Sequence, residues 1–218
     1  MKSKLSKKDA GAFLSRFGMP GAVRAGQGDL QGRLGWDAIP LSPNLRSMSG
    51  QFKVNIEKGQ FLKSEPGVGR FLGVLSLQSL PRRLTLDFRD LFSQGFAFDF
   101  FRGDVNIQQG VARSENLQMK GVAATVFMDG WANVNEETQD LKVLVVPELN
   151  AGTASIMYSA VNPVVGLTSF LAQYVLRQPL IRANTEHMRI SGTWSDPVVD
   201  KIDPETGQVL SSSREKKP

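Results

Sequence analysis

Apolar residues recur at every second position over much of this chain, and this spacing limits the possible folds more than any other feature. Phe52, Val54 and Ile56 alternate with polar neighbours, and similar runs follow along the chain. A period of two is typical of β-strands with one apolar face, and such strands usually pair antiparallel. We therefore predict a mainly β fold, with strands within residues 27–147 and a final strand at 187–195.

Helical spacing of apolar residues interrupts this pattern in a few places. Pro66 begins one such segment and Pro81 ends it, as expected from the positions that proline tolerates in helices. The fold class is therefore α+β, with three or four short helices. Residues 1–199 are predicted to form one domain, and the polar residues 200–218 a disordered tail. The predicted helices are an amphipathic helix at 7–17, a second at 67–80, and two apolar helices within 154–177.

Turn and bulge signals divide the region of strands. Residues 57–59 (EKG) and 108–110 (QQG) are predicted to be turns between paired strands. The consecutive phenylalanines at 100–101 break the alternation, and a β-bulge there would account for the change of register. Both turns end a shared pattern, because Val54–Gly59 reads VNIEKG and Val105–Gly110 reads VNIQQG. Two interpretations stay open: a chance similarity, or a repeated strand–turn–strand unit.

The positive charge is concentrated at the N-terminus. The chain has a net charge of +5 and a pI of about 9.6. Residues 1–16 contain five basic side chains and one acidic side chain, which leaves only +1 for everything that follows. A nearly neutral body lacks the basic surface that follows a phosphate backbone. We therefore expect no nucleic-acid partner.

The residues needed for catalysis are scarce. There are no cysteines and one histidine, His187, which excludes thiolate nucleophiles and sites that need two imidazoles. No Gly-x-Ser-x-Gly motif accompanies His187, so a histidine at the start of a strand is the better interpretation. Residues 67–73 contain glycines spaced almost as in a dinucleotide-binding loop, but close helix packing explains them better. We predict a protein that is not an enzyme, with no cofactor and no metal site.

Two of the predicted helices have features of an interface. Arginines flank the helix at 67–80, and a narrow polar stripe runs along the otherwise apolar helix at 163–177. Such helices either cover a sheet or meet a membrane surface or a partner protein. Both interpretations stay open. The candidate residues for the second are Arg70, Arg82, Arg83, Ser169, Gln173 and Arg177.

Several strings in the sequence resemble a known family. Residues 69–84 read GRFLGVLSLQSLPRRL and residues 86–99 read LDFRDLFSQGFAFD. Together with 116–121 (NLQMKG) and 190–197 (ISGTWSDP), they resemble the C-terminal region of the large AsmA-like proteins of the YhdP type. The resemblance covers about residues 8 to 200.

The resemblance implies a role in lipid transport. Members of this family are anchored in the inner membrane of Gram-negative bacteria by an N-terminal helix. Their periplasmic body is a twisted sheet with an apolar groove for phospholipids. By this resemblance we expect the terminal part of a bridge-like phospholipid transporter between inner and outer membrane, supporting outer-membrane lipid homeostasis and barrier function. The family implies the periplasmic face of the inner membrane, although we expect no signal peptide or transmembrane helix in this chain itself.

In this interpretation the sheet is curved and its apolar face forms part of the groove. Phospholipid acyl chains are then the expected partner, held by burial of their methylene groups. The alternative is a structural or interaction module that docks a membrane or envelope partner without binding lipid, and it predicts a fully packed apolar interior. The candidate groove residues are Phe52, Val54, Ile56, Phe98, Val105 and Ile107.

Overall fold

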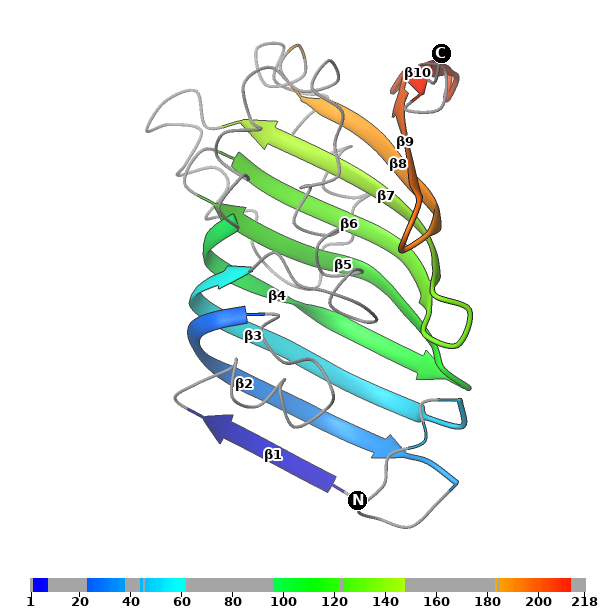
Figure 1. The fold of residues 1–218 in the computed structure, drawn as a ribbon. Coiled ribbons are helices and arrows are strands. Elements are labelled where there is room, and N and C mark those ends of the chain that lie inside the picture. The colour runs from blue at the N-terminus through cyan, green and yellow to red at the C-terminus, as the bar shows by residue number, and fades with distance from the viewer. Residues whose placement is uncertain are drawn as a thin grey trace.

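The described part of the chain forms one curved antiparallel β-sheet of ten strands (Figure 1). The computed structural model describes residues 2–7, 23–37, 44, 46–61, 96–121, 124–147, 183 and 185–212. The strands are β1 (Lys2–Lys7), β2 (Val23–Gly35), β3 (Ser49–Phe61), β4 (Phe96–Gln108), β5 (Val111–Gly121), β6 (Ala124–Asn133), β7 (Thr138–Pro147), β8 (Glu186–Thr193), β9 (Pro197–Ile202) and β10 (Val209–Ser212).

The order of the strands in the sheet is their order in the sequence. Each strand pairs antiparallel with the next, so β1 and β10 are the two edges and the sheet is open rather than closed. This agrees with the predicted antiparallel fold. Alternating sequences favour it because they present one apolar face and one polar face to opposite sides of a sheet.

The apolar side chains of successive strands lie on one side of the sheet, which we call the apolar face. Residues that are paired across two strands point to the same side, and the apolar face follows such pairs from β2 to β9. It is formed by Leu30, Phe52, Val54, Ile56, Phe98, Phe101, Val105, Ile107, Leu117, Met119, Ala124, Val126, Met128, Leu141, Val143, Val145, Met188, Ile190 and Val199. The opposite side is the polar face.

A line of backbone irregularities crosses β2, β3 and β4. Ala25 in β2 and Lys58 in β3 have positive φ angles of 57° and 53°. In β4 the register with β5 shifts just after Phe98, which makes Asp99 an extra residue. Phe98 and Phe101 are three positions apart and both belong to the apolar face. The bulge predicted near the paired phenylalanines is therefore confirmed, and the three strands curl at this end of the sheet (Figure 1).

The predicted turn at 57–59 is wrong. Strand β3 continues through these residues to Phe61, with β2 hydrogen-bonded on one edge and β4 on the other. Pairing on both edges keeps the segment extended, so the left-handed Lys58 bends the strand instead of reversing it. The other predicted turn is confirmed, because Gln109 and Gly110, with φ angles of 50° and 80°, join β4 to β5. Two consecutive positive φ angles are typical of a type I′ hairpin.

The segments predicted to be helical lie almost entirely outside the described residues. This applies to 67–80, to the two helices within 154–177, and to 8–17 of the first helix. The exception is Lys7, which ends strand β1 and was expected to begin that helix. Hydrogen bonding to β2 supplies every residue of this short edge strand with a partner, whatever its helical propensity.

The polar segment that we expected to be disordered from residue 200 is ordered as far as Ser212. It forms the end of β9 and the edge strand β10. Between them, Asp203 Oδ1 accepts hydrogen bonds from the backbone N–H groups of Glu205 and Thr206, both at 2.8 Å. Backbone pairing and a side chain that closes a turn do not need apolar residues, which is why polar composition alone misjudged this segment.

Candidate functional site

The apolar face is more exposed at one end of the sheet than at the other. Val126, Ile190 and Val199, on β6 to β9, are 0% exposed. Leu30 and Phe52, on β2 and β3, are only partly buried against the same cluster. The apolar face therefore passes from an ordinary protein core into a surface that is accessible in part. Leu34 of β2 belongs to the same face, because it is paired with Gly50. We call the partly exposed residues of this face the half-buried patch: Leu30, Leu34, Phe52, Val105 and Leu117.

All six candidate groove residues lie on the apolar face. Phe52 is directly opposite Val105 on the neighbouring strand, and Ile56 is opposite Phe101. Four of the six are nine-tenths or more buried, at 8%, 9%, 3% and 5% exposed for Val54, Ile56, Phe98 and Ile107. Phe52 and Val105 alone among them are half-buried, so these two have the accessibility that contact with a ligand requires.

Glycines lie beside the large side chains of the patch. Gly32 is opposite Phe52, and a Cβ atom at Gly32 would come within 2.2 Å of the Gln51 carbonyl oxygen. Gly59 is opposite Phe98, whose ring would lie 2.4 Å from a Cβ atom at that position. Glycine in a strand interior often marks close approach of a backbone or a ligand. Here Gly59 leaves room for the ring of Phe98, whereas at Gly32 the neighbouring backbone of β3 occupies the space.

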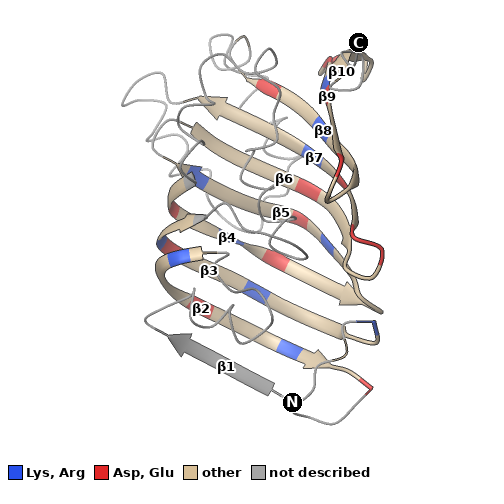
Figure 2. Cartoon of the chain, viewed as in Figure 1, with Lys and Arg blue, Asp and Glu red and all other residues tan. Residues whose placement is uncertain are grey.

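The polar face carries charges of both signs across neighbouring strands (Figure 2). Lys53 Nζ on β3 lies 3.4 Å from Asp104 Oδ1 on β4. Arg189 donates hydrogen bonds from Nε and one terminal nitrogen to the two carboxylate oxygens of Asp140, at 2.8 and 2.7 Å. Opposite charges on adjacent strands stabilise a sheet modestly. Such a face is suited to water rather than to an apolar ligand.

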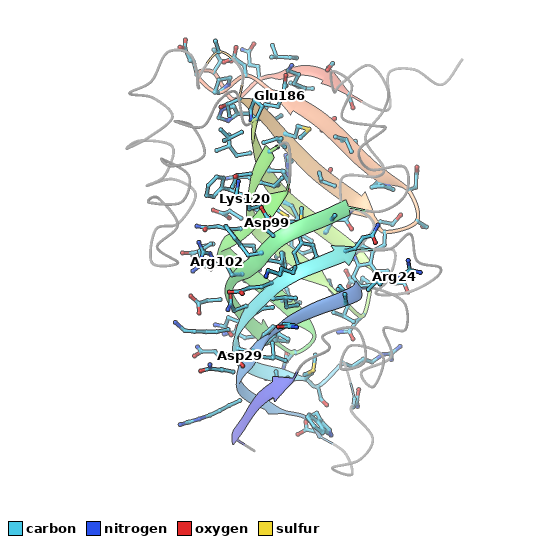
Figure 3. The ribbon with its side chains drawn as sticks, turned by 90° about the vertical axis from the view of Figure 1, so that its left-hand side faces the viewer. Arg24, Asp29, Asp99, Arg102, Lys120 and Glu186 are labelled. Carbon is cyan, nitrogen blue, oxygen red and sulfur yellow. The ribbon has the colours of Figure 1, made fainter. Side chains whose placement is uncertain are left out.

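The polar face also has an apolar region over β4 to β7. Phe127 and Leu144 are 2% and 1% exposed, although they point away from the apolar face. The Arg102 guanidinium lies 4.1 Å from the centre of the Phe100 ring, which is a cation–π contact. Lys120 is opposite Phe100 and is 5% exposed, and Figure 3 shows it on the same side of the sheet as Arg102. Residues 124–128 of β6 and 143–146 of β7 are thus buried on both faces.

Four titratable groups on the polar face have shifted pKa values, namely Asp129, Asp140, His187 and Arg189. The hydrogen bond from Arg189 lowers the pKa of Asp140. Burial raises the pKa of Asp129, against the opposing charge of Lys142. Burial also lowers the pKa of His187, which lies at the start of β8 opposite Leu144. These shifts have structural causes, namely one ion pair and partial desolvation.

Metal-binding groups and membrane-spanning helices can be assessed only for the residues that the structure describes. Among them, no three His, Cys, Asp or Glu side chains come together as a group that could hold a metal ion. The same part of the chain contains no helix long and apolar enough to span a membrane. The six residues proposed for an interfacial or partner helix, Arg70, Arg82, Arg83, Ser169, Gln173 and Arg177, lie outside the described ranges.

The candidate residues predicted from the sequence did not include the part of the apolar face that lies beyond β4. Met119, Val126, Val143 and Ile190 extend it across β5 to β8. The signal for them was present, because each lies in a segment expected to be a strand and alternates with residues of the other face. What the alternation lacked was the pairing register, which continues the line of Phe101 through Met119 and Val126 to Val145. The same register brings Val143 and Ile190 to this face through their pairs with Met188 and Leu141.

This arrangement can bind apolar material without directional chemistry. Each methylene group moved from water onto an apolar surface contributes about 0.8 kcal/mol, and the half-buried patch is the part of the apolar face that water reaches. The polar side chains beside it are arranged as ion pairs and turns rather than as an acid, a base and a nucleophile. The site therefore favours binding of a chain-like apolar ligand over catalysis.

Comparison with known proteins agrees with the expected family. A family model described as "YhdP protein" matches residues 1–199. A curated relative, the intermembrane phospholipid transporter YhdP of Escherichia coli strain K12, is 29% identical over 203 residues. These residues are 93% of this chain and 16% of the relative, so the chain spans less than a fifth of its length. No solved structure matches the chain.

Proposed function

Because this chain belongs to the YhdP family, we propose that it contributes a section of an apolar groove along which phospholipids move. The observation that carries the proposal is the half-buried patch at one end of an otherwise buried apolar face. Acyl chains would lie against Phe52 and Val105, while the polar face stays in water. Movement would be passive, since burial of methylene groups does not depend on a fixed position along the groove.

The relative's name supports the choice of ligand. That protein is described as an intermembrane phospholipid transporter, and we extend this activity to the section that the present chain resembles. On this proposal residues 1–199 are one domain at the terminal part of a bridge between the inner and outer membranes, on the periplasmic side. It would support outer-membrane lipid homeostasis and barrier function without enzymatic chemistry.

The remaining parts of the proposal concern segments outside the described residues. Short helices within 8–17, at 67–80 and within 154–177 would accompany the sheet, and residues 213–218 would be a polar tail. The helices near the C-terminal end are the proposed contact with a membrane surface or an envelope protein. The polar residues of the helix at 163–177 and the arginines that flank the helix at 67–80 remain the candidates for that contact.

The experiment compares two double variants of the same two strands. F52D/V105D adds two carboxylates to the half-buried patch, and Q51D/N106D adds two to the polar face at directly neighbouring positions. Phe52 is paired with Val105, and Gln51 is paired with Asn106. The added charge and the proximity of the two carboxylates are therefore matched, and only the face differs.

The measurement is native mass spectrometry of the purified 218-residue chain, with lipid extraction from the same sample. We expect phospholipid to remain bound to the original chain and to Q51D/N106D, and to be lost from F52D/V105D. Circular dichroism checks that all three are folded. A folded original chain without lipid would favour the alternative, a structural module that docks a partner. Equal lipid binding by both double variants would show that the patch is not the binding surface.

A further inference from the structure

A cavity of about 730 Å³ lies where β2 ends, β3 begins and β4 turns into β5. It is lined by Gly35, Trp36, Asp37, Arg46, Ser47, Ser49 and Gln109. Side-chain hydrogen bonds fix its wall, because Ser47 Oγ accepts from the Asp37 N–H at 2.9 Å and Ser49 Oγ accepts from the Gln109 N–H at 3.0 Å. Segments 60 positions apart are thereby held around one opening.

The cavity contains one positive and one negative side chain that are not paired with each other. Arg46 and Asp37 are both exposed, and within the described part of the chain neither takes part in an ion pair. The backbone N–H of Arg46 is bonded to Asn44 Oδ1 at 3.0 Å, which anchors the residue beside the cavity. Trp36 adds an aromatic ring to the same lining.

We propose that this cavity binds the headgroup of a zwitterionic phospholipid, with a phosphate and a primary ammonium group. A guanidinium is the side chain best suited to a phosphate. A carboxylate together with an indole ring is suited to an ammonium group, by ion pairing and by the cation–π interaction. A ligand with both charges fits Arg46, Asp37 and Trp36 at once, whereas a purely anionic headgroup leaves the Asp37 carboxylate unmatched or opposed.

The cavity lies at the strand ends next to Leu34 of the half-buried patch. Gly35 and Ser49 form a pair that faces the polar side, whereas Trp36, two positions after Leu34, follows the apolar side. Gly50 follows Ser49 and is paired with Leu34 and Ile107 on the apolar face. From Gly50 to Val54 the strand extends about 14 Å, at roughly 3.4 Å per residue. One leaflet of a membrane has a hydrocarbon layer of about 15 Å, half of the full core. A lipid with its headgroup at these strand ends would reach the apolar face past Trp36 and Leu34, and its acyl chains could then extend over Phe52.

This inference rests on the proposed function, so its test separates the two. The 218-residue chain is incubated with vesicles that contain equal amounts of dioleoyl phosphatidylethanolamine and dioleoyl phosphatidylglycerol, and the bound lipids are identified by mass spectrometry. We expect the original chain to retain more of the ethanolamine lipid. Asp37→Asn should lower the ratio of ethanolamine to glycerol lipid by about fivefold or less, the size expected for a solvent-exposed charge pair.

Arg46→Gln should act differently, because both lipids have the phosphate. It should lower the total bound lipid and leave the ratio nearly unchanged. Asp196→Asn and Arg24→Gln are the matched controls, since both residues are exposed and neither lines the cavity; they should change neither value.

Bound lipid with no headgroup preference, or a ratio that Asp37→Asn leaves unchanged, would overturn the headgroup site while the proposed function stands. A folded chain that binds neither lipid would overturn both. Loss of lipid from the control variants as well would also overturn the headgroup site, because charge at any position would then have the same effect.

Discussion

The two ends of the apolar face have the same kind of side chains but different surroundings. On β6 to β9, Val126 and Ile190 are fully buried, and the polar face directly behind Val126 is buried as well, at Thr125 and Phe127. On β2 and β3, Leu30 and Phe52 are only partly covered, and the polar face behind them carries exposed charges. One sheet therefore combines a protein core with an accessible apolar surface.

This difference shows how an open sheet can bind lipid and still fold. The buried end contributes the free energy that keeps the strands together, because cores are close-packed and sensitive to the loss of single methyl groups. The half-buried patch contributes less to stability and leaves apolar area available. Variants that separate stability from lipid binding should therefore separate the two ends of the sheet.

The largest expected contrast compares the same substitution at the two ends. Val126→Ala in β6 should lower the free energy of unfolding by about 3 kcal/mol, from two lost methyl groups and the cavity they leave. Val105→Ala in the half-buried patch should lower it by about 1 kcal/mol or less, since water already reaches that side chain. Urea denaturation followed by circular dichroism measures both. Equal losses would mean that the two ends are equally covered.

Substitution of Gly32, which lies beside the half-buried patch, should lower the free energy of unfolding as much as a substitution in the core. Gly32→Ala places a Cβ atom 2.2 Å from the Gln51 carbonyl oxygen, and backbone on the neighbouring strand cannot move away easily. We expect a loss of about 1–3 kcal/mol, even though Gly32 lies beside the half-buried patch. Gly35→Ala is the matched control on the same strand, where the nearest atom is 3.9 Å away. A tolerated Gly32→Ala would mean that β2 and β3 are less closely paired than the geometry indicates.

The smallest effect concerns the ion pair on the polar face between β7 and β8. Arg189→Gln should raise the pKa of Asp140 towards its ordinary value, because the hydrogen bond that lowers it is lost. The lowered pKa of the folded state stabilises the protein above the unfolded-state value and is lost as the pH falls through the folded-state pKa. The variant should therefore be less stable by under about 1 kcal/mol at neutral pH and equal to the original chain in acid. NMR titration of the Asp140 carboxyl measures the shift directly, and an unchanged pKa would contradict the assignment.

The strands and the two faces of the sheet can be predicted from the sequence because the alternation is local. The two copies of the Val-Asn-Ile-x-x-Gly pattern show where such prediction ends. At Val105–Gly110 the pattern closes a hairpin, and at Val54–Gly59 it bends a continuous strand. In both, the residue before glycine is left-handed, so the local conformation is shared. Pairing on both edges of β3 decides the outcome, and pairing is a property of distant residues.

The candidate site was predictable in part for the same reason. The alternation identified the apolar residues of β3 and β4, but not which of them are accessible. Phe52 and Val54 are two positions apart on one face, yet only Phe52 remains half-buried. The cavity beside Trp36 depends on three strand ends that meet through the register of the sheet, and no local motif marks it. Strand β10 shows the converse, since it buries neither Val209 nor Leu210 and is ordered by pairing with β9.

The most direct test of the lipid-binding account is site-specific photo-cross-linking on the two faces of β3. A benzophenone amino acid replaces Phe52 in one variant and Gln51 in another, so that adjacent residues report on opposite sides of the same strand. The purified chain is irradiated in the presence of phospholipid vesicles, and lipid adducts are identified by mass spectrometry. The account predicts adducts at position 52 and few or none at position 51. Equal labelling at both positions, or labelling at position 51 alone, would contradict the claim that the apolar face of this sheet is the surface that holds lipid.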